Sequence, residues 1–156
     1  MTRLSAKQAR QLGIMPCPAL KKKQPKEANC RWDAKILPGG CVWISIPEIP
    51  PSLNVWSRWH WAKRNRYLNE LSRNMTWLAK YAKLPRYDRA TVQVVYYFGD
   101  LRPRDKDNYS GKFLLDALRH GGIIAEDNSA VLGLPEPDFR VDKVSPRTEI
   151  FVWEVK

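Results

Sequence analysis

The sequence is poor in cysteine and has no long apolar run. Its three cysteines, Cys17, Cys30 and Cys41, are an odd number, and no two of them form a Cys-x-x-Cys pair. A disulfide framework or a structural zinc site is therefore not expected, and a reducing compartment such as the cytoplasm is favoured. No apolar stretch approaches the roughly 20 residues that a helix needs to cross a bilayer. The N-terminus also lacks the apolar core of a secretory signal, so we expect neither a membrane segment nor secretion.

Acidic residues are also in the minority. The chain has 27 lysines and arginines against 16 acids, which gives a formal net charge of +11. A chain this basic is a candidate polyanion binder, because contacts with phosphates release condensed counterions. Charge alone does not separate nucleic acid from an anionic membrane or a solubilising role, but nucleic acid is the partner we favour. The 156 residues, 44% hydrophobic and 28% charged, suit one globular domain.

The chain divides near residue 38, and no internal repeat is present. Residues 1–38 contain the proline- and lysine-rich stretch PCPALKKKQPKEANC and read as a basic N-terminal arm or linker, with room for a short helix at its start. The arm would either contact nucleic acid or keep the chain soluble. Residues 39–156 carry the pattern of a folded domain.

Hydrophobic periodicity in this domain predicts alternating strands and helices. Residues 41–46 alternate, with Val42, Ile44 and Ile46 on one face, as in a strand. An apolar stripe at three- and four-residue steps predicts a long helix that ends before Pro85. Further strands are expected at 90–98 and 147–155, a second helix at 108–119 before two glycines, and a short strand and a turn after them. The expected fold is a single α/β (α+β) domain, a mixed β-sheet with two main helices.

Cations recur along the long helix. Arg66, Arg73 and Lys80 are seven residues apart and fall close to the side opposite the apolar stripe. They form either an ordinary solvated face or a cationic ridge along a DNA backbone. The preceding run WSRWHWAKRNRY interleaves tryptophans with cations, so that rings can stack on bases while cations meet phosphates. Some of these tryptophans are expected in the core.

A pair of acids interrupts a basic loop in the second half of the chain. Asp105 and Asp107 lie one residue apart, close to Arg102 and Arg104, where a strand gives way to a helix. One interpretation is structural, with Asp107 as the N-cap of the helix. The other is chemical: the two carboxylates hold a metal ion against a phosphate that the arginines bind bidentately.

Asp127 and Lys112 favour the chemical interpretation. A helix that reverses at the two glycines would return Asp127, which follows Glu126, to the sheet end that carries Asp105 and Asp107. Clustered carboxylates repel one another unless a cation compensates them, and hard oxygen ligands without histidine or cysteine indicate Mg²⁺ or Mn²⁺. Lys112 could direct its ammonium group at a scissile phosphate. Because such a cation lowers the pKa of a bound water, these parts together predict metal-dependent phosphodiester hydrolysis.

The stretch RPRDKDNYSGKFLLDALRHGGIIAEDNSAV resembles the signature of the RusA family of Holliday-junction resolvases. That signature combines an Arg-bearing Asp-x-Asp-Asn loop, a lysine, an Asp-Ala-Leu helix, a glycine turn and an acidic pair. The upstream PPSLNVW is similar to the family's Pro-Pro-Ser-x-Asn segment, so the resemblance covers roughly residues 41–155. Counted from Asp107, the lysine comes one residue late, which indicates an insertion near Ser110 and Gly111 that Gly111 could absorb either as a bulge or as a late helix start.

By this resemblance, Asp105, Asp107 and Asp127 are the catalytic metal-binding residues, and Lys112 is the catalytic lysine. Family members are small homodimers that bind four-way DNA junctions and make paired nicks with Mg²⁺ or Mn²⁺, in bacteria and bacteriophages. The residues expected to contact DNA are Arg102, Arg104, Asn54, Arg66, Arg73 and Lys80.

We therefore expect an endodeoxyribonuclease that resolves Holliday junctions in DNA recombination and repair. A homodimer suits this chemistry, since one active site in each subunit can cut two opposed strands. Two alternatives stay open. One is a non-catalytic protein that binds branched DNA, its site spoiled by the insertion beside Lys112; the other is a general nuclease for forks and flaps.

Overall fold

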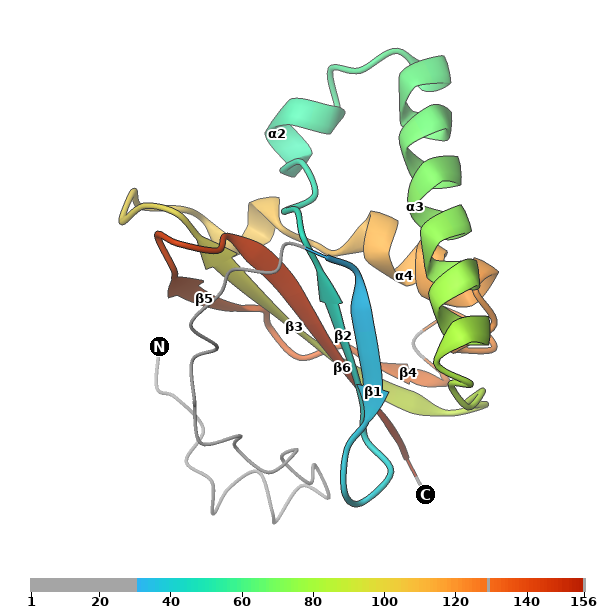
Figure 1. Ribbon diagram of the computed structural model, residues 1–156. Helices are drawn as coiled ribbons and strands as arrows, with labels where there is room; N and C mark the ends of the chain where they lie inside the picture. The colour runs from blue at the N-terminus through green and yellow to red at the C-terminus, as the bar shows by residue number, and fades with distance from the viewer. Residues whose placement is uncertain (1–30, 129, 156) are drawn as a thin grey trace.

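Six strands form one sheet in the computed structural model, which describes residues 31–128 and 130–155 (Figure 1). The strands are β1 Asp33–Ile36, β2 Val42–Ile46, β3 Ala90–Phe98, β4 Leu132–Gly133, β5 Asp138–Val141 and β6 Arg147–Glu154. The helices in the described ranges are α2 Leu53–Trp56, α3 Trp61–Tyr81 and α4 Lys112–His120, and a 3₁₀ turn, η1, spans Lys106–Asn108. None of these helices is long and apolar enough to cross a membrane.

The sheet is mixed because β3 has different partners on its two sides. Its order is β1-β2-β6-β3-β4, and β5 also pairs with β3. The pairs β1–β2, β2–β6 and β6–β3 are antiparallel, whereas β4 and β5 run parallel to β3. A parallel neighbour needs a crossover connection, and η1 and α4 lie within it. The expected fold class, a mixed sheet with two main helices, α3 and α4, is confirmed.

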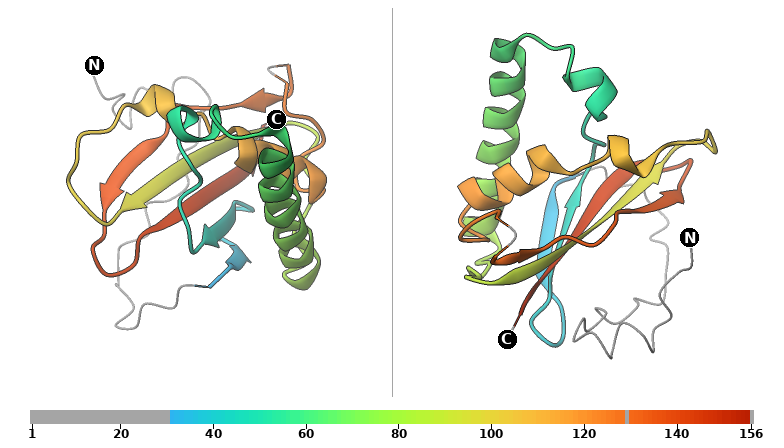
Figure 2. Two further views of the ribbon diagram at one scale, coloured as in Figure 1. Left: turned by 90° about the horizontal axis from the view of Figure 1, so that it is seen from above. Right: turned by 180° about the vertical axis from the view of Figure 1, so that it is seen from behind.

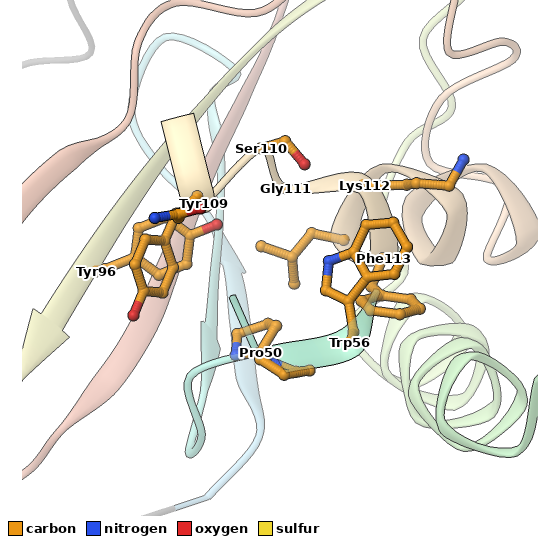
Figure 3. A pocket seen from close by; sticks show the side chains of 11 residues that line it. Pro50, Trp56, Tyr96, Tyr109, Ser110, Gly111, Lys112 and Phe113 are labelled. Carbon is orange, nitrogen blue, oxygen red and sulfur yellow. The ribbon is translucent and has the colours of Figure 1, made fainter. Parts of the chain in front are cut away.

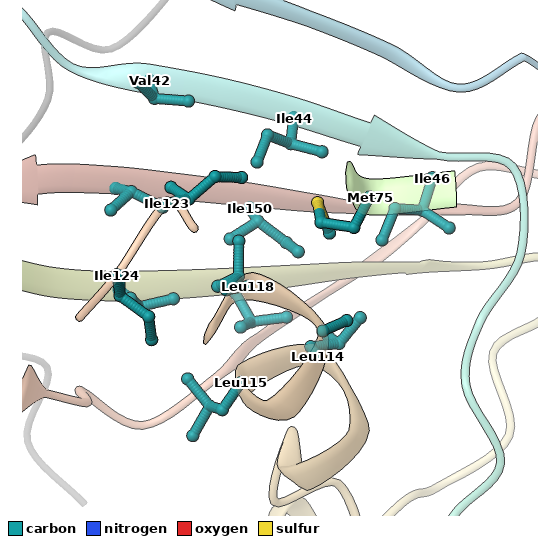
Figure 4. Packing of buried hydrophobic residues seen from close by; sticks show 14 of the residues in the cluster. Val42, Ile44, Ile46, Met75, Leu114, Leu115, Leu118, Ile123, Ile124 and Ile150 are labelled. Atoms are coloured by element: carbon teal, nitrogen blue, oxygen red, sulfur yellow. The ribbon is translucent and has the colours of Figure 1, made fainter. Parts of the chain in front are cut away.

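The helices α3 and α4 pack together on one face of the sheet (Figure 2). On β2, Val42, Ile44 and Ile46 are all fully buried on that face, because alternate residues of a strand point to the same side. Figure 4 shows them with side chains of both helices around Ile150 of β6. Ile150 lies opposite Ile44 on one side and Val94 on the other, which puts β6 at the centre of the core.

The helix α3 is the long helix that the apolar stripe predicts. The imidazole of His60 caps its start by accepting a hydrogen bond from the Ala62 N–H at 3.2 Å. Leu71, Met75 and Leu78 are buried in the core. The helix therefore presents one apolar side to the sheet and α4 and leaves its other side to solvent.

Four features differ from the sequence-based expectations. The strand β1 lies within residues 1–38, the range that composition assigns to an arm, so the sheet begins before residue 39. Residues 1–30, with the expected short helix, lie outside the described residues. The second helix begins at Lys112 rather than at residue 108. The short strand expected after the two glycines is reduced to a single bridge between Tyr87 and Ile124, and β5 was not expected.

Candidate active site

The loop after β3 fixes one arginine in place and exposes another. The Cζ atom of Arg104 lies 3.9 Å from the centroid of the Phe98 ring, and its Nη2 donates to Asp100 Oδ1 at 2.8 Å. The Arg104 side chain is only 19% exposed, whereas that of Arg102 is 82% exposed. The Arg102 N–H and the Arg104 guanidinium both donate to Asp100 and lower the pKa of its carboxyl. A guanidinium already held in this way loses little freedom when it binds a phosphate.

Asp105 and Asp107 follow these arginines at η1. Asp105 is the N-cap of η1, and its Oδ1 accepts a hydrogen bond from the Asp107 N–H at 3.1 Å. Asp107 lies within the turn, and both aspartates are exposed. The N-cap of α4 is Gly111. The structural interpretation of Asp107 as the cap of that helix is therefore wrong, and the capping role at this point belongs to Asp105.

Gly111 separates η1 from α4. Its φ of +71° and ψ of 16° are left-handed values, which glycine adopts without the steric cost that a Cβ atom brings. The chain turns there, and Lys112 becomes the first residue of α4. The helix therefore starts late, after Gly111.

Asp116 and Asp127 meet beside α4. Asp116 lies one turn after Lys112, and its carboxyl lies near that of Asp127, which helps to raise the pKa of Asp116. Burial is the largest cause of the raised pKa of Asp116; the contact with Asp127 adds to it, while the charges of Lys112 and Arg119 oppose it. The Asp116 side chain is 15% exposed. Arg119, whose Nη2 lies 4.0 Å from Asp116 Oδ1, and Lys112 offset part of the repulsion between the two carboxylates.

Asp116 is a site residue that the sequence analysis missed. In KFLLD it lies four residues after Lys112, a spacing that puts both on the same side of a helix and was available as a signal. The closeness of Asp116 to Asp127 could not be predicted from the sequence. That contact depends on how the chain reverses at Gly122, which has a φ of +74°.

A narrow hollow opens beside the start of α4 (Figure 3). Trp56 lines one side, Tyr96 and Tyr109 line the other, and Lys112 lies at the rim. The Trp56 ring meets Phe113 of α4 edge to face, with centroids 5.4 Å apart. The PPSLNVW segment therefore forms a wall next to the candidate site, and this tryptophan packs against the core instead of standing in solvent.

The acids of the site occur as two pairs. Asp105 joins Asp107 through the backbone hydrogen bond, and Asp116 contacts Asp127. Within the described ranges, no three His, Cys, Asp or Glu side chains lie close enough together to hold a metal ion. The predicted set of Asp105, Asp107 and Asp127 is therefore not gathered into one group. The donors are all carboxylate oxygens, so their chemistry fits a hard divalent cation such as Mg²⁺ or Mn²⁺.

The predicted DNA contacts lie on three different elements. Asn54 is exposed on α2, and Arg66, Arg73 and Lys80 are exposed along α3. Arg102 and Arg104 belong to the loop between β3 and η1. Exposure is what a backbone contact requires, and the contacts themselves stay predictions.

Comparison with known proteins gives no family assignment. No protein-family model matches the chain, and no curated protein matches it.

Proposed function

We propose that the protein is a metal-dependent endodeoxyribonuclease that resolves four-way DNA junctions by paired nicks, acts as a homodimer and serves DNA recombination or repair. The observation that carries the proposal is the closeness of Asp127 to Asp116 and Lys112 of α4. That helix follows Asp105 and Asp107 in the chain. Burial of the Asp116 carboxyl opposes folding, and carboxyl groups with a raised pKa concentrate at functional sites. The resemblance to the RusA signature supports the same conclusion.

The residues around the start of α4 divide the work of such a reaction. Arg104, held by Phe98 and Asp100, would bind a phosphate next to the cut. Lys112 would place its ammonium group against the charge that develops on the scissile phosphate, and the amino end of α4 adds a partial positive charge in the same place.

The carboxylates are the residues that would hold a divalent cation, with Asp105, Asp107 and Asp127 as the ligands that the resemblance implies. When bound, such an ion supplies an activated water and neutralises negative charge. The exposed cations of α3 would hold the DNA backbone, which gives affinity with little base readout. Two subunits related by a two-fold axis would present two such sites to opposed strands.

Nick mapping tests the proposal. Purified protein is incubated with an end-labelled four-way junction and Mg²⁺, beside Asp107→Asn and the control Asp88→Asn, which removes the same charge from an exposed loop outside the site. We expect symmetric nicks from the wild type and the control. Asp107→Asn should bind the junction at least as well and leave it uncut, because it removes a negative charge that faces phosphate. Nicking by Asp107→Asn at the wild-type rate would refute the metal-site assignment.

A second candidate function is binding of branched DNA without cleavage. The separation of the described acids into two pairs favours it. Tight junction binding without nicks, in both Mg²⁺ and Mn²⁺, would establish this function. Comparing junction, fork and duplex in the same assay separates both candidates from a general nuclease for branched DNA.

A further inference from the structure

Two aromatic side chains stand in solvent on α3. Trp77 and Tyr81 are one helical turn apart and stack with their ring planes 9° apart and their centroids 5.1 Å apart. Trp77 is 60% exposed and Tyr81 is 74% exposed. The stack therefore holds both rings nearly parallel, with wide apolar surfaces open to water.

The core does not account for these rings. The helix α3 packs on the sheet and α4 through Leu71, Met75 and Leu78, which are buried in the core. Trp77 and Tyr81 belong neither to the core nor to the partly buried residues packed against it. Large apolar side chains that are adjacent and exposed forgo the stability that burial would give, and such patches mark interaction surfaces more often than single exposed residues do.

The surroundings of the stack are cationic. Arg73 lies one turn before Trp77 and Lys80 lies about one turn after it, and both are exposed. The helix carries five lysines and arginines and one acid, Glu70, which is two turns away from Trp77. Lys83, also exposed, follows the end of the helix. This combination fits a partner that offers both flat ring faces and negative charge.

We propose that Trp77 and Tyr81 form a stacking platform for unpaired nucleic-acid bases, with Arg73 and Lys80 contacting the phosphates of the same strand. Paired bases inside a duplex have both faces covered by their neighbours, whereas an unpaired arm or an opened junction centre exposes them. The platform therefore selects DNA that carries an unpaired strand. The inference rests on the proposed function and deepens it, because it assigns a second binding surface to an unpaired strand of the same DNA substrate.

Paired substitutions separate ring chemistry from apolar character. In the full chain, Trp77→Leu with Tyr81→Leu removes the rings and keeps apolar side chains, and Trp77→Phe with Tyr81→Phe keeps rings. Affinity for a labelled oligothymidylate is measured by fluorescence anisotropy. The leucine pair should bind about 5- to 150-fold more weakly, the loss expected when stacking on one base is removed. The phenylalanine pair should retain most of the affinity, and binding of a fully paired junction should stay at the wild-type level in both.

Several outcomes would overturn the platform. These are no oligothymidylate binding by the wild type, equal binding by the wild type and the leucine pair, or a wild-type dimer in sedimentation velocity that the leucine pair lacks. The last result would assign the rings to a contact between two copies of the chain.

Nicking of a fully paired junction, measured in parallel, reads the proposed function separately. If the wild type binds oligothymidylate more tightly than the leucine pair but does not nick the junction, the nuclease is refuted and the platform stands. If the junction is nicked but the wild type and the leucine pair bind oligothymidylate equally, only the platform is refuted.

Discussion

Gly111→Ala changes the backbone at the start of α4 and little else. A Cβ atom added there would come no closer than 3.8 Å to Tyr96 Oη and 4.0 Å to Val94 Cγ2, which are ordinary van der Waals distances. The energetic cost therefore comes from the φ of +71°, because an L-residue with a side chain is strained in the left-handed region by about 1–2 kcal/mol. We expect the free energy of unfolding to fall by that amount.

The sign of this change separates two descriptions of the segment. If residues 108–119 formed one continuous helix, position 111 would lie in its interior, where alanine is more stable than glycine by about 1 kcal/mol. Gly111→Ala would then stabilise the protein. Urea denaturation followed by circular dichroism measures the difference. A stabilised variant would refute both the left-handed turn and the start of α4 at Lys112.

Two variants serve as controls for this experiment. Gly111→Asn should lose less stability than Gly111→Ala, because asparagine tolerates the left-handed region better. Gly39 has a φ of +90° and no atom within 4 Å of an added Cβ, and it lies in the turn between β1 and β2. Gly39→Ala should therefore lose stability without losing junction nicking. Gly111→Ala should lose both, since it displaces Lys112.

Three other outcomes are expected. Arg147→Ala leaves the buried Glu149 without its partner at 2.9 Å and should lower the free energy of unfolding by about 2–3 kcal/mol. The loss is smaller than for a fully buried pair because the Arg147 side chain is 23% exposed. An unchanged urea midpoint would contradict this expectation. A hydrogen bond from Arg147 lowers the pKa of Asp142. The stability that this hydrogen bond gives is therefore complete above the ordinary carboxyl pKa and is lost as the pH falls below about 4. Wild-type protein should consequently lose more stability on acidification than Arg147→Ala, and parallel curves would contradict the assignment. Deleting residues 1–30 should weaken junction binding and flatten its salt dependence, and equal salt slopes would show that this segment is not a DNA contact.

The elements that the sequence predicts correctly are those with a long periodic pattern. In β2, Val42, Ile44 and Ile46 alternate, and the structure buries all three. In α3, the three- and four-residue steps of the apolar stripe match the buried side of the helix. Local preference and tertiary packing agree in these segments, so the pattern alone suffices.

Short elements and special backbone values escape such an analysis. The strand β1 has four residues and is mostly exposed, so its composition resembles a polar linker, and it becomes a strand by pairing with β2. The strand β5 forms in the same way beside β3. The start of α4 depends on the φ of Gly111, and the contact of Asp116 with Asp127 depends on where a turn returns the chain. The spacing of residues in the sequence predicts neither the φ of Gly111 nor the place to which the turn returns the chain.

The position of β6 has a consequence for the time at which the domain can fold. Of the six described strands, β6 is synthesised last, yet it lies between β2 and β3 in the sheet. Until residues 147–154 have left the ribosome, Ile44 and Val94 lack the strand that lies between them, and one edge of β2 and one edge of β3 stay unpaired. A growing chain can form the β1–β2 hairpin and α3 but cannot close its core. The domain therefore folds after β6 is made, and a chain stalled before that point presents unpaired apolar strands to chaperones and to other chains.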